Sequence, residues 1–126
     1  MQLKPKLLIV DDEEINRKYL ESFLVTGYEV YTCGSVSNFY RLVSMMNFDV
    51  IIMDIYLHDT KDGIQLTREL KMNPRYSRVP VFILTANNTR KTSDDAFQAG
   101  ATKLFDKMIN RKTLVEEINK HFSTTA

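Results

Sequence analysis

Short apolar runs separated by longer amphipathic stretches form the main pattern of this chain. The clearest runs are Leu7 to Val10, Val50 to Met53 and Val81 to Leu84. They are continuous rather than alternating with polar residues, which is typical of strands covered by helices on both faces. Tyr28 to Thr32 and Thr102 to Phe105 complete a predicted set of five strands in one parallel sheet.

Segments of helical period lie between these runs, so strand and helix alternate along the chain. They cover Glu13 to Thr26, Val36 to Met46, Gly63 to Met72 and Lys91 to Ala99. A last helix is predicted after Asn110 as its N-cap, because Leu114, Ile118 and Phe122 then stack on one face. The alternation predicts an α/β fold with five helices.

The length of 126 residues suits one domain with one core, and 44% hydrophobic and 26% charged residues is an ordinary globular composition. No internal repeat or low-complexity segment interrupts the chain. We therefore expect a single domain over residues 1–126, in which 123–126 form either a short tail or the start of a linker.

Charge and composition exclude several classes of function. Seventeen basic against sixteen acidic residues leave a net charge of +1, which gives no bulk attraction to nucleic acid or anionic membranes. The apolar stretches are about half a membrane span or shorter, so no membrane insertion is expected and a cytoplasmic protein is the default. The single cysteine, Cys33, forms no intrachain disulfide and is expected to serve packing.

The apolar runs end at residues that can handle a phosphoryl group or its metal. Asp11 and Asp12 follow the first run, Asp54 the third and Thr85 the fourth, and Lys107 lies just beyond the fifth. The carboxyl ends of parallel strands lie along one edge of the sheet, where open α/β sheets bind their ligands. We therefore expect these five side chains to converge.

Three aspartates at one edge repel one another. At an effective dielectric of about 20, two carboxylates about 4 Å apart destabilise each other by about 4 kcal/mol. One lysine cannot offset this repulsion, whereas an all-oxygen donor set favours Mg²⁺ together with a phosphate. The alternative is that each aspartate only caps a helix or turn.

Four segments of the chain match the motifs of a known family. They are LLIVDDEEINR, FDVIIMDIYL, VPVFILTAN and AGATKLFDK. In this order and spacing they resemble the receiver domains of two-component response regulators over essentially the whole chain. The resemblance implies a flavodoxin-like, doubly wound, five-stranded parallel sheet in the order 2-1-3-4-5 with five helices in three αβα layers.

The resemblance also implies a role for each residue at the strand ends. The implied set is Asp54 as phosphoacceptor, Asp12 and Asp54 as direct Mg²⁺ ligands, Asp11 as a ligand through water, the backbone carbonyl of Tyr56 as a further ligand, and Thr85 and Lys107 as contacts of the phosphoryl group. Tyr56 and Asn87 would help set the lifetime of the aspartyl phosphate, with the large Tyr56 shielding it.

The implied function is a switch rather than a turnover enzyme, although such a domain catalyses its own phosphorylation and dephosphorylation. The phosphoryl group would come from the phosphohistidine of a sensor histidine kinase or a histidine phosphotransfer protein. Phosphorylation would change the face formed by helix 4, strand 5 and helix 5. No direct contact with nucleic acid is expected, and the output protein is not defined by the sequence.

The chain departs from the family pattern around the lysine. Met108 follows Lys107 where the family usually has proline after a cis peptide bond, and a cis bond to methionine costs about 3 to 4 kcal/mol. We therefore predict a trans bond. Leu104 occupies the position of an aromatic switch residue, and Phe105 should point to the opposite face, into the core. Asp106 is expected to be either a partner contact or a solvated edge charge.

The loop after Asp54 is one residue longer than the commonest receiver version and carries His58 where proline often lies. His58 could tune the site near neutral pH, but an exposed histidine without a role is the simpler expectation. Gly63 is expected to relieve a turn of positive φ.

Three other functions compete with a phosphorylated switch. A degenerate receiver could act as a constitutive protein-interaction module, since the usual proline and aromatic residue are replaced. A haloacid-dehalogenase-like phosphatase would need an acid where Tyr56 stands, and a flavin site would need a Ser/Thr/Gly-rich loop where Asp11 to Glu14 stand. The complete set of acceptor residues favours the switch.

Overall fold

The computed structural model of the chain describes residues 3–123, in which strands and helices alternate strictly. The elements are β1 (Lys6–Val10), α1 (Glu14–Leu24), β2 (Glu29–Cys33), α2 (Val36–Met45), β3 (Val50–Asp54), α3 (Gly63–Met72), β4 (Val81–Thr85), α4 (Arg90–Ala99), β5 (Lys103–Asp106) and α5 (Arg111–Ser123). All strand pairs are parallel, and the sheet order is β2-β1-β3-β4-β5. The predicted fold and strand order are confirmed.

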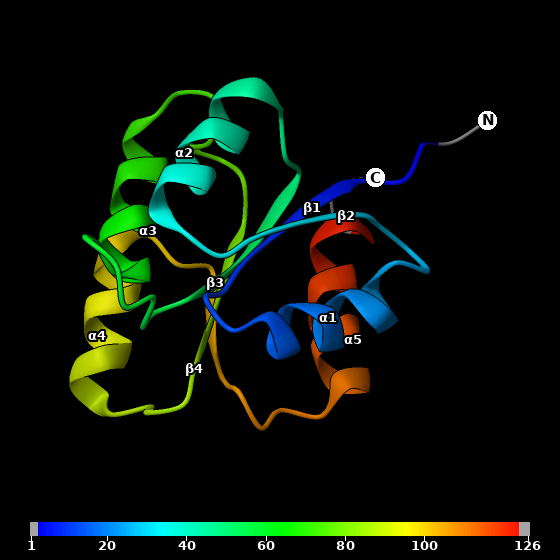
Figure 1. Cartoon of the computed structure of the whole chain (residues 1–126). Helices are drawn as coiled ribbons and strands as arrows, with labels where there is room; N and C mark the ends of the chain where they lie inside the picture. Colours follow the sequence, from blue (N-terminus) through cyan, green and yellow to red (C-terminus); the bar gives the residue numbers. More distant parts are fainter. Residues whose placement is uncertain (1–2, 124–126) are drawn as a thin grey trace.

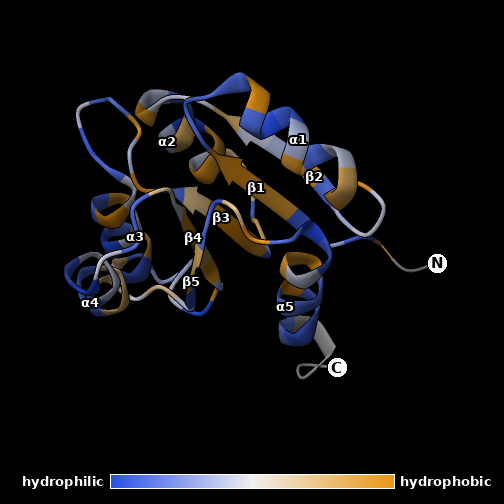
Figure 2. Ribbon diagram, turned by 90° about the horizontal axis from the view of Figure 1, so that it is seen from below, coloured by the Kyte–Doolittle hydropathy of each residue, from blue (hydrophilic) through white to orange (hydrophobic). Residues whose placement is uncertain are grey.

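Helices cover both faces of the sheet, with α2, α3 and α4 on one side and α1 and α5 on the other (Figure 1). Successive strand residues point to opposite faces, so each strand supplies both sides of the core. Leu8 and Ile51 belong to the cluster under α2, α3 and α4, whereas Leu7 and Ile52 belong to the cluster under α1 and α5. The central strands are accordingly hydrophobic while the outer helix surfaces are largely hydrophilic (Figure 2).

The edge strand β5 and the last helix follow the predicted pattern. Phe105 packs against the cluster under α1 and α5, where its ring stacks on that of Phe82 with centroids 6.2 Å apart. Leu104 packs against the opposite cluster. Leu114 and Ile118 of α5 are buried as predicted, whereas the side chain of Phe122 lies outside the described part of the chain, as do residues 124–126 of the expected tail.

The carboxyl ends of the strands are level across the sheet. Val10 of β1 is paired with Met53 of β3, and Asp54 is paired with Leu84 of β4. Thr85, the last residue of β4, is paired with Asp106 of β5. The residues that follow these positions therefore meet at one edge.

Gly63 begins α3 directly against the end of β3. The expectation of a positive φ at this glycine is wrong, since Gly100 is the one glycine of the described residues with a positive φ. A Cβ at Gly63 would lie 2.0 Å from the carbonyl oxygen of Asp54 and 2.8 Å from Cγ of Met53. Close approach of two backbones, rather than an unusual dihedral angle, requires glycine here.

We predict that Gly63→Ala destabilises the protein by about 2 kcal/mol or more, because the added methyl group must displace the end of β3. The matched control is Gly27→Ala, since a Cβ at Gly27 meets nothing within 4 Å. That control should be neutral or slightly stabilising. Urea unfolding of both variants measures the difference, and equal midpoints would contradict the close-approach explanation.

Candidate functional site

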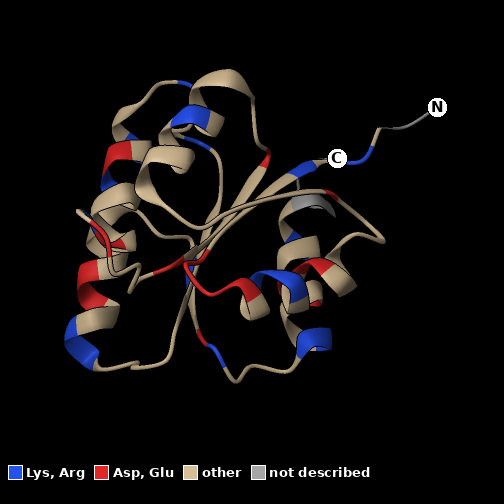
Figure 3. Cartoon of the chain, viewed as in Figure 1, with Lys and Arg blue, Asp and Glu red and all other residues tan. Residues whose placement is uncertain are grey.

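Three aspartates meet at the carboxyl edge of the sheet. Asp11 and Asp12 directly follow β1, and Asp54 ends β3; one carboxylate oxygen from each lies within 4.8 Å of the others. Acidic positions gather where β1 and β3 end and continue into α1 (Figure 3). Asp11 and Asp54 are each only 3% exposed, so the predicted convergence places two carboxylates in a buried environment.

Lys107 faces this cluster from the segment after β5. Its backbone N–H donates to the carbonyl oxygen of Thr85 at 2.9 Å, which holds the residue beside the end of β4. Its ammonium nitrogen lies 3.1 Å from Oδ2 of Asp54 and 3.5 Å from Oδ2 of Asp11. Burial opposes the charge of Lys107, but hydrogen bonding and attraction to the two aspartates outweigh it and raise its pKa.

The electrostatic balance at Asp54 is unfavourable to its charge. Burial and the neighbouring charge of Asp11 raise the pKa of Asp54 to about 6, although Lys107 acts in the opposite direction. Oδ1 of Asp54 is buried and has no hydrogen-bond partner among the described residues. One ammonium group therefore leaves part of the negative charge unbalanced, as the sequence suggested.

This donor set fits a divalent cation. Hard cations such as Mg²⁺ take carboxylate and carbonyl oxygens and keep several waters, and the buried, unpartnered Oδ1 of Asp54 is an oxygen that lacks its expected partner. A cleft lined by Asp12, Glu13, Asp54, Tyr56, His58, Ala86 and Lys107 opens over the aspartates. The cluster is thus accessible to a cation and to a phosphoryl group.

Thr85 ends β4 directly before Ala86, which lines the cleft. The Thr85 side chain is fully buried, and its hydroxyl oxygen accepts the backbone N–H of Asn87 at 3.1 Å. A hydroxyl that accepts one bond still has its own hydrogen to donate. Asn87 is exposed, and Tyr56 is 44% exposed on the loop that lines the cleft.

His58 has a contact that sequence reasoning did not anticipate. Its side chain is 79% exposed, as expected, yet its Nδ1 lies 2.7 Å from Oδ2 of Asp12. It is also the one non-glycine residue of the described chain with a positive φ, 52°. A left-handed histidine reaching back across a loop leaves no signal in hydrophobic periodicity, and only the replacement of the usual proline marked the position.

The segment after Lys107 differs little from expectation. No peptide bond of the described residues is cis, so the Lys107–Met108 bond is trans as predicted. The Met108 side chain is 89% exposed, and its backbone N–H donates to Oδ1 of Asp106 at 2.7 Å. Asp106 therefore stabilises the turn that leads out of β5.

A doubly wound sheet with an acidic cleft at its carboxyl edge defines a class of signalling domain, and comparison of sequences identifies the family. Residues 7–119 match the model of the response regulator receiver domain. The chain belongs to this family of two-component signal transduction domains. None of the helices within residues 3–123 is long and apolar enough to cross a membrane.

Curated relatives contain a similar segment within longer proteins. Protein PetR of Rhodobacter capsulatus is 33% identical over 116 residues, which are 91% of this chain and 47% of PetR. The regulatory protein AtoC of Escherichia coli is 31% identical over 115 residues, which are 90% of this chain and 23% of AtoC. The chain thus spans about half or less of the length of these relatives.

Solved structures of receiver proteins superpose closely on the chain. The chemotaxis protein CheY4 of Vibrio cholerae is 26% identical with a TM-score of 0.87, covering 94% of this chain and 98% of CheY4. The receiver domain of the sensor histidine kinase PA1611 of Pseudomonas aeruginosa is 28% identical with a TM-score of 0.83. The match covers 94% of this chain and 97% of that domain. That structure holds a magnesium ion in its active site cleft.

The raised pKa of Asp54 makes the stability of the metal-free protein depend on pH. Because the folded-state pKa of about 6 exceeds the ordinary 3.8, the folded protein binds the proton more tightly, and stability falls as pH rises between these values. Asp54→Asn removes the free-energy cost of ionising this carboxyl in the folded protein. We therefore predict that the free energy of unfolding rises by about 2 to 3 kcal/mol at neutral pH and that this gain disappears near pH 4.

Urea unfolding in the presence of a chelator measures this gain. The control is Asp49→Asn, which alters a carboxylate at the opposite end of β3 that accepts the backbone N–H of Lys6 at 2.8 Å. This control should show no gain at neutral pH. A loss of stability in Asp54→Asn at neutral pH would contradict the electrostatic argument.

Proposed function

We propose that this chain is a phosphoacceptor receiver domain of a two-component phosphorelay, in which Asp54 accepts a phosphoryl group from a phosphohistidine. The observation that carries the proposal is the buried, unpartnered Oδ1 of Asp54, a residue that lines a cleft together with two further carboxylates and an ammonium group. The donor would be a sensor histidine kinase or a histidine phosphotransfer protein. Asp54 provides the nucleophile, and the surrounding charges orient both groups.

The proposed metal ligands are those that the resemblance to receiver domains implies. Asp12 and Asp54 would hold Mg²⁺ directly, Asp11 through water, and the backbone carbonyl of Tyr56 would complete the protein's share. A bound Mg²⁺ supplies positive charge to the carboxylates and to the phosphoryl oxygens. The all-oxygen donor set and the charge that Lys107 leaves unbalanced support this assignment.

In the proposed transfer, a carboxylate oxygen of Asp54 bonds to phosphorus as the bond from phosphorus to the donor imidazole nitrogen breaks. The electron pair of that bond leaves with the imidazole, and an aspartyl phosphate remains. Lys107 already lies 3.1 Å from Asp54 and can pair with a phosphoryl oxygen as a compact point charge. Hydrolysis of the acyl phosphate by water would end the signal.

The proposed output is a change in the face formed by α4, β5 and α5. The Thr85 hydroxyl would donate to a phosphoryl oxygen and draw the loop after β4 toward the site. The carbonyl oxygen of Thr85 also accepts the backbone N–H of Lys107. A movement of Thr85 would therefore also move the segment after β5. Leu104 provides no aromatic ring for a rotamer switch, so in this proposal the backbone of these segments would carry the change.

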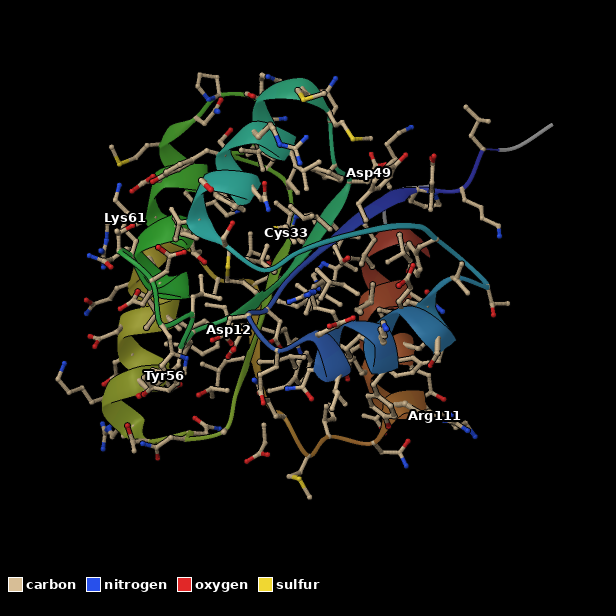
Figure 4. All side chains as sticks on the ribbon, in the orientation of Figure 1. Asp12, Cys33, Asp49, Tyr56, Lys61 and Arg111 are labelled. Carbon is tan, nitrogen blue, oxygen red and sulfur yellow. The ribbon has the colours of Figure 1, made fainter. Side chains whose placement is uncertain are left out.

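We predict that incubation with Mg²⁺ and acetyl phosphate adds a single phosphoryl group, measured by intact mass. Asp54→Asn should remove the adduct, whereas Asp49→Asn should keep it, because Asp49 lies at the opposite end of the sheet from the cleft (Figure 4). A chelator should also abolish the adduct. A folded protein that forms no adduct would favour the constitutive interaction module.

We also predict that Tyr56→Ala shortens the lifetime of the aspartyl phosphate, because the half-exposed ring lines the cleft through which water must enter. The rate of loss of the phosphoryl adduct after removal of the donor measures this. Tyr40→Ala is the control, since Tyr40 is also partly exposed but bonds to Glu69 on α3. Equal decay in wild type and Tyr56→Ala would show that the ring does not shield the phosphate.

A further inference from the structure

The loop between β3 and α3 carries His58, which lines the cleft and contacts Asp12. Asp59 anchors the loop to the start of α2, because its Oδ2 accepts the backbone N–H of Val36 at 2.9 Å. Lys61 anchors it to α3 through Glu69, with 2.5 Å between Nζ and Oε2. Tyr56 and Lys61, which flank His58 in the sequence, both lie on the α3 side of Asp12 (Figure 4).

Asp12 differs from the other two aspartates in its partner. The Lys107 ammonium lies within 3.6 Å of Asp11, Asp54 and Glu13, but no ion pair joins it to Asp12. His58 occupies that role, because an ionised carboxylate only accepts and Nδ1–H must therefore donate to Oδ2 of Asp12. The repulsion within the cluster is thus reduced by two separate donors, one on each side of the cleft.

We propose that His58 is a latch that holds Asp12 when no cation is bound and that a divalent cation must displace. This inference rests on the proposed function, in which Asp12 is a direct metal ligand. The imidazole N–H points its positive end at the carboxylate that the cation would coordinate, so the two compete for the same negative charge. His58 consequently lowers the affinity of the site for the cation and links cation binding to the β3–α3 loop.

Two features of the chain favour the view that His58 competes with the cation for Asp12 over the view that His58 supports Asp12 as a ligand. The His58 side chain is 79% exposed, so water can replace its hydrogen bond at small cost when it leaves Asp12. The positive φ of 52° is uncommon for a residue other than glycine, so the loop conformation that brings His58 to Asp12 is one that few residues favour by themselves. Both features make the latched state easy to open by a cation.

The test is the dissociation constant for Mg²⁺, measured by isothermal titration calorimetry at one fixed pH for the wild type, His58→Ala and Thr60→Ala. We expect His58→Ala to bind Mg²⁺ about two- to five-fold more tightly, the range expected for loss of one solvent-exposed competing contact to a charged group. Thr60→Ala changes an exposed residue of the same loop and should bind like the wild type. His58→Gly accommodates the positive φ and should bind as tightly as His58→Ala.

Nuclear magnetic resonance gives a second readout that a merely structural role would not move. The imidazole signals of His58 should shift during the Mg²⁺ titration with the same midpoint as the calorimetry, as the latch opens. In Asp12→Asn, the imidazole signals of His58 should not shift with this midpoint during the Mg²⁺ titration.

Three results would overturn the proposal. Unchanged affinity for Mg²⁺ in both His58 variants would show that His58 is not a latch, while the proposed metal site would still stand. Weaker binding would show that His58 supports Asp12 as a ligand instead of competing for it. Absence of Mg²⁺ binding in the wild type and in every variant would overturn both the latch and the metal site of the proposed function.

Discussion

Mutual repulsion of carboxylates at one edge of a buried sheet is the constraint on which the rest of this structure depends. The parallel arrangement brings the ends of β1 and β3 together, and the cores on both faces keep Asp11 and Asp54 away from water. Lys107 lowers the resulting energy without removing it, as the raised pKa of Asp54 shows. The hydrophobic sheet thus supports a cluster of carboxylates that is unfavourable by itself and that a cation would stabilise.

The rigidity of this edge comes from close backbone packing, while its adjustable parts come from loops. Gly63 lets α3 begin against the carbonyl of Asp54, so Asp54 is held between the end of β3 and the start of α3. The loops after β3 and β5 supply His58 and Lys107, which contact different aspartates of the cluster. A site of this form can change its surroundings without moving Asp54.

The fold and the convergence of Asp11, Asp12, Asp54 and Lys107 could be predicted because they follow from continuous apolar runs and from the geometry of parallel strands. The contact of His58 with Asp12 could not, since it depends on one left-handed residue in a loop whose course no periodicity describes. The reason for a glycine at position 63 was predicted wrongly. A sequence shows that a glycine is present, but it does not show whether close backbone approach or a positive φ requires it.

Leu104 stands where the family pattern has an aromatic residue, but contacts still join Thr85 to the segment after β5. Thr85 ends β4, pairs with Asp106 of β5 and accepts the backbone N–H of Lys107. Asp106 in turn accepts the backbone N–H of Met108, which is almost fully exposed at the molecular surface. A series of strand pairing and hydrogen bonds, the last of them to a side-chain oxygen of Asp106, therefore runs from the fully buried threonine to an exposed methionine. In the proposed switch, a displacement of Thr85 would reach the segment after β5 through these contacts, without a rotating ring at Leu104.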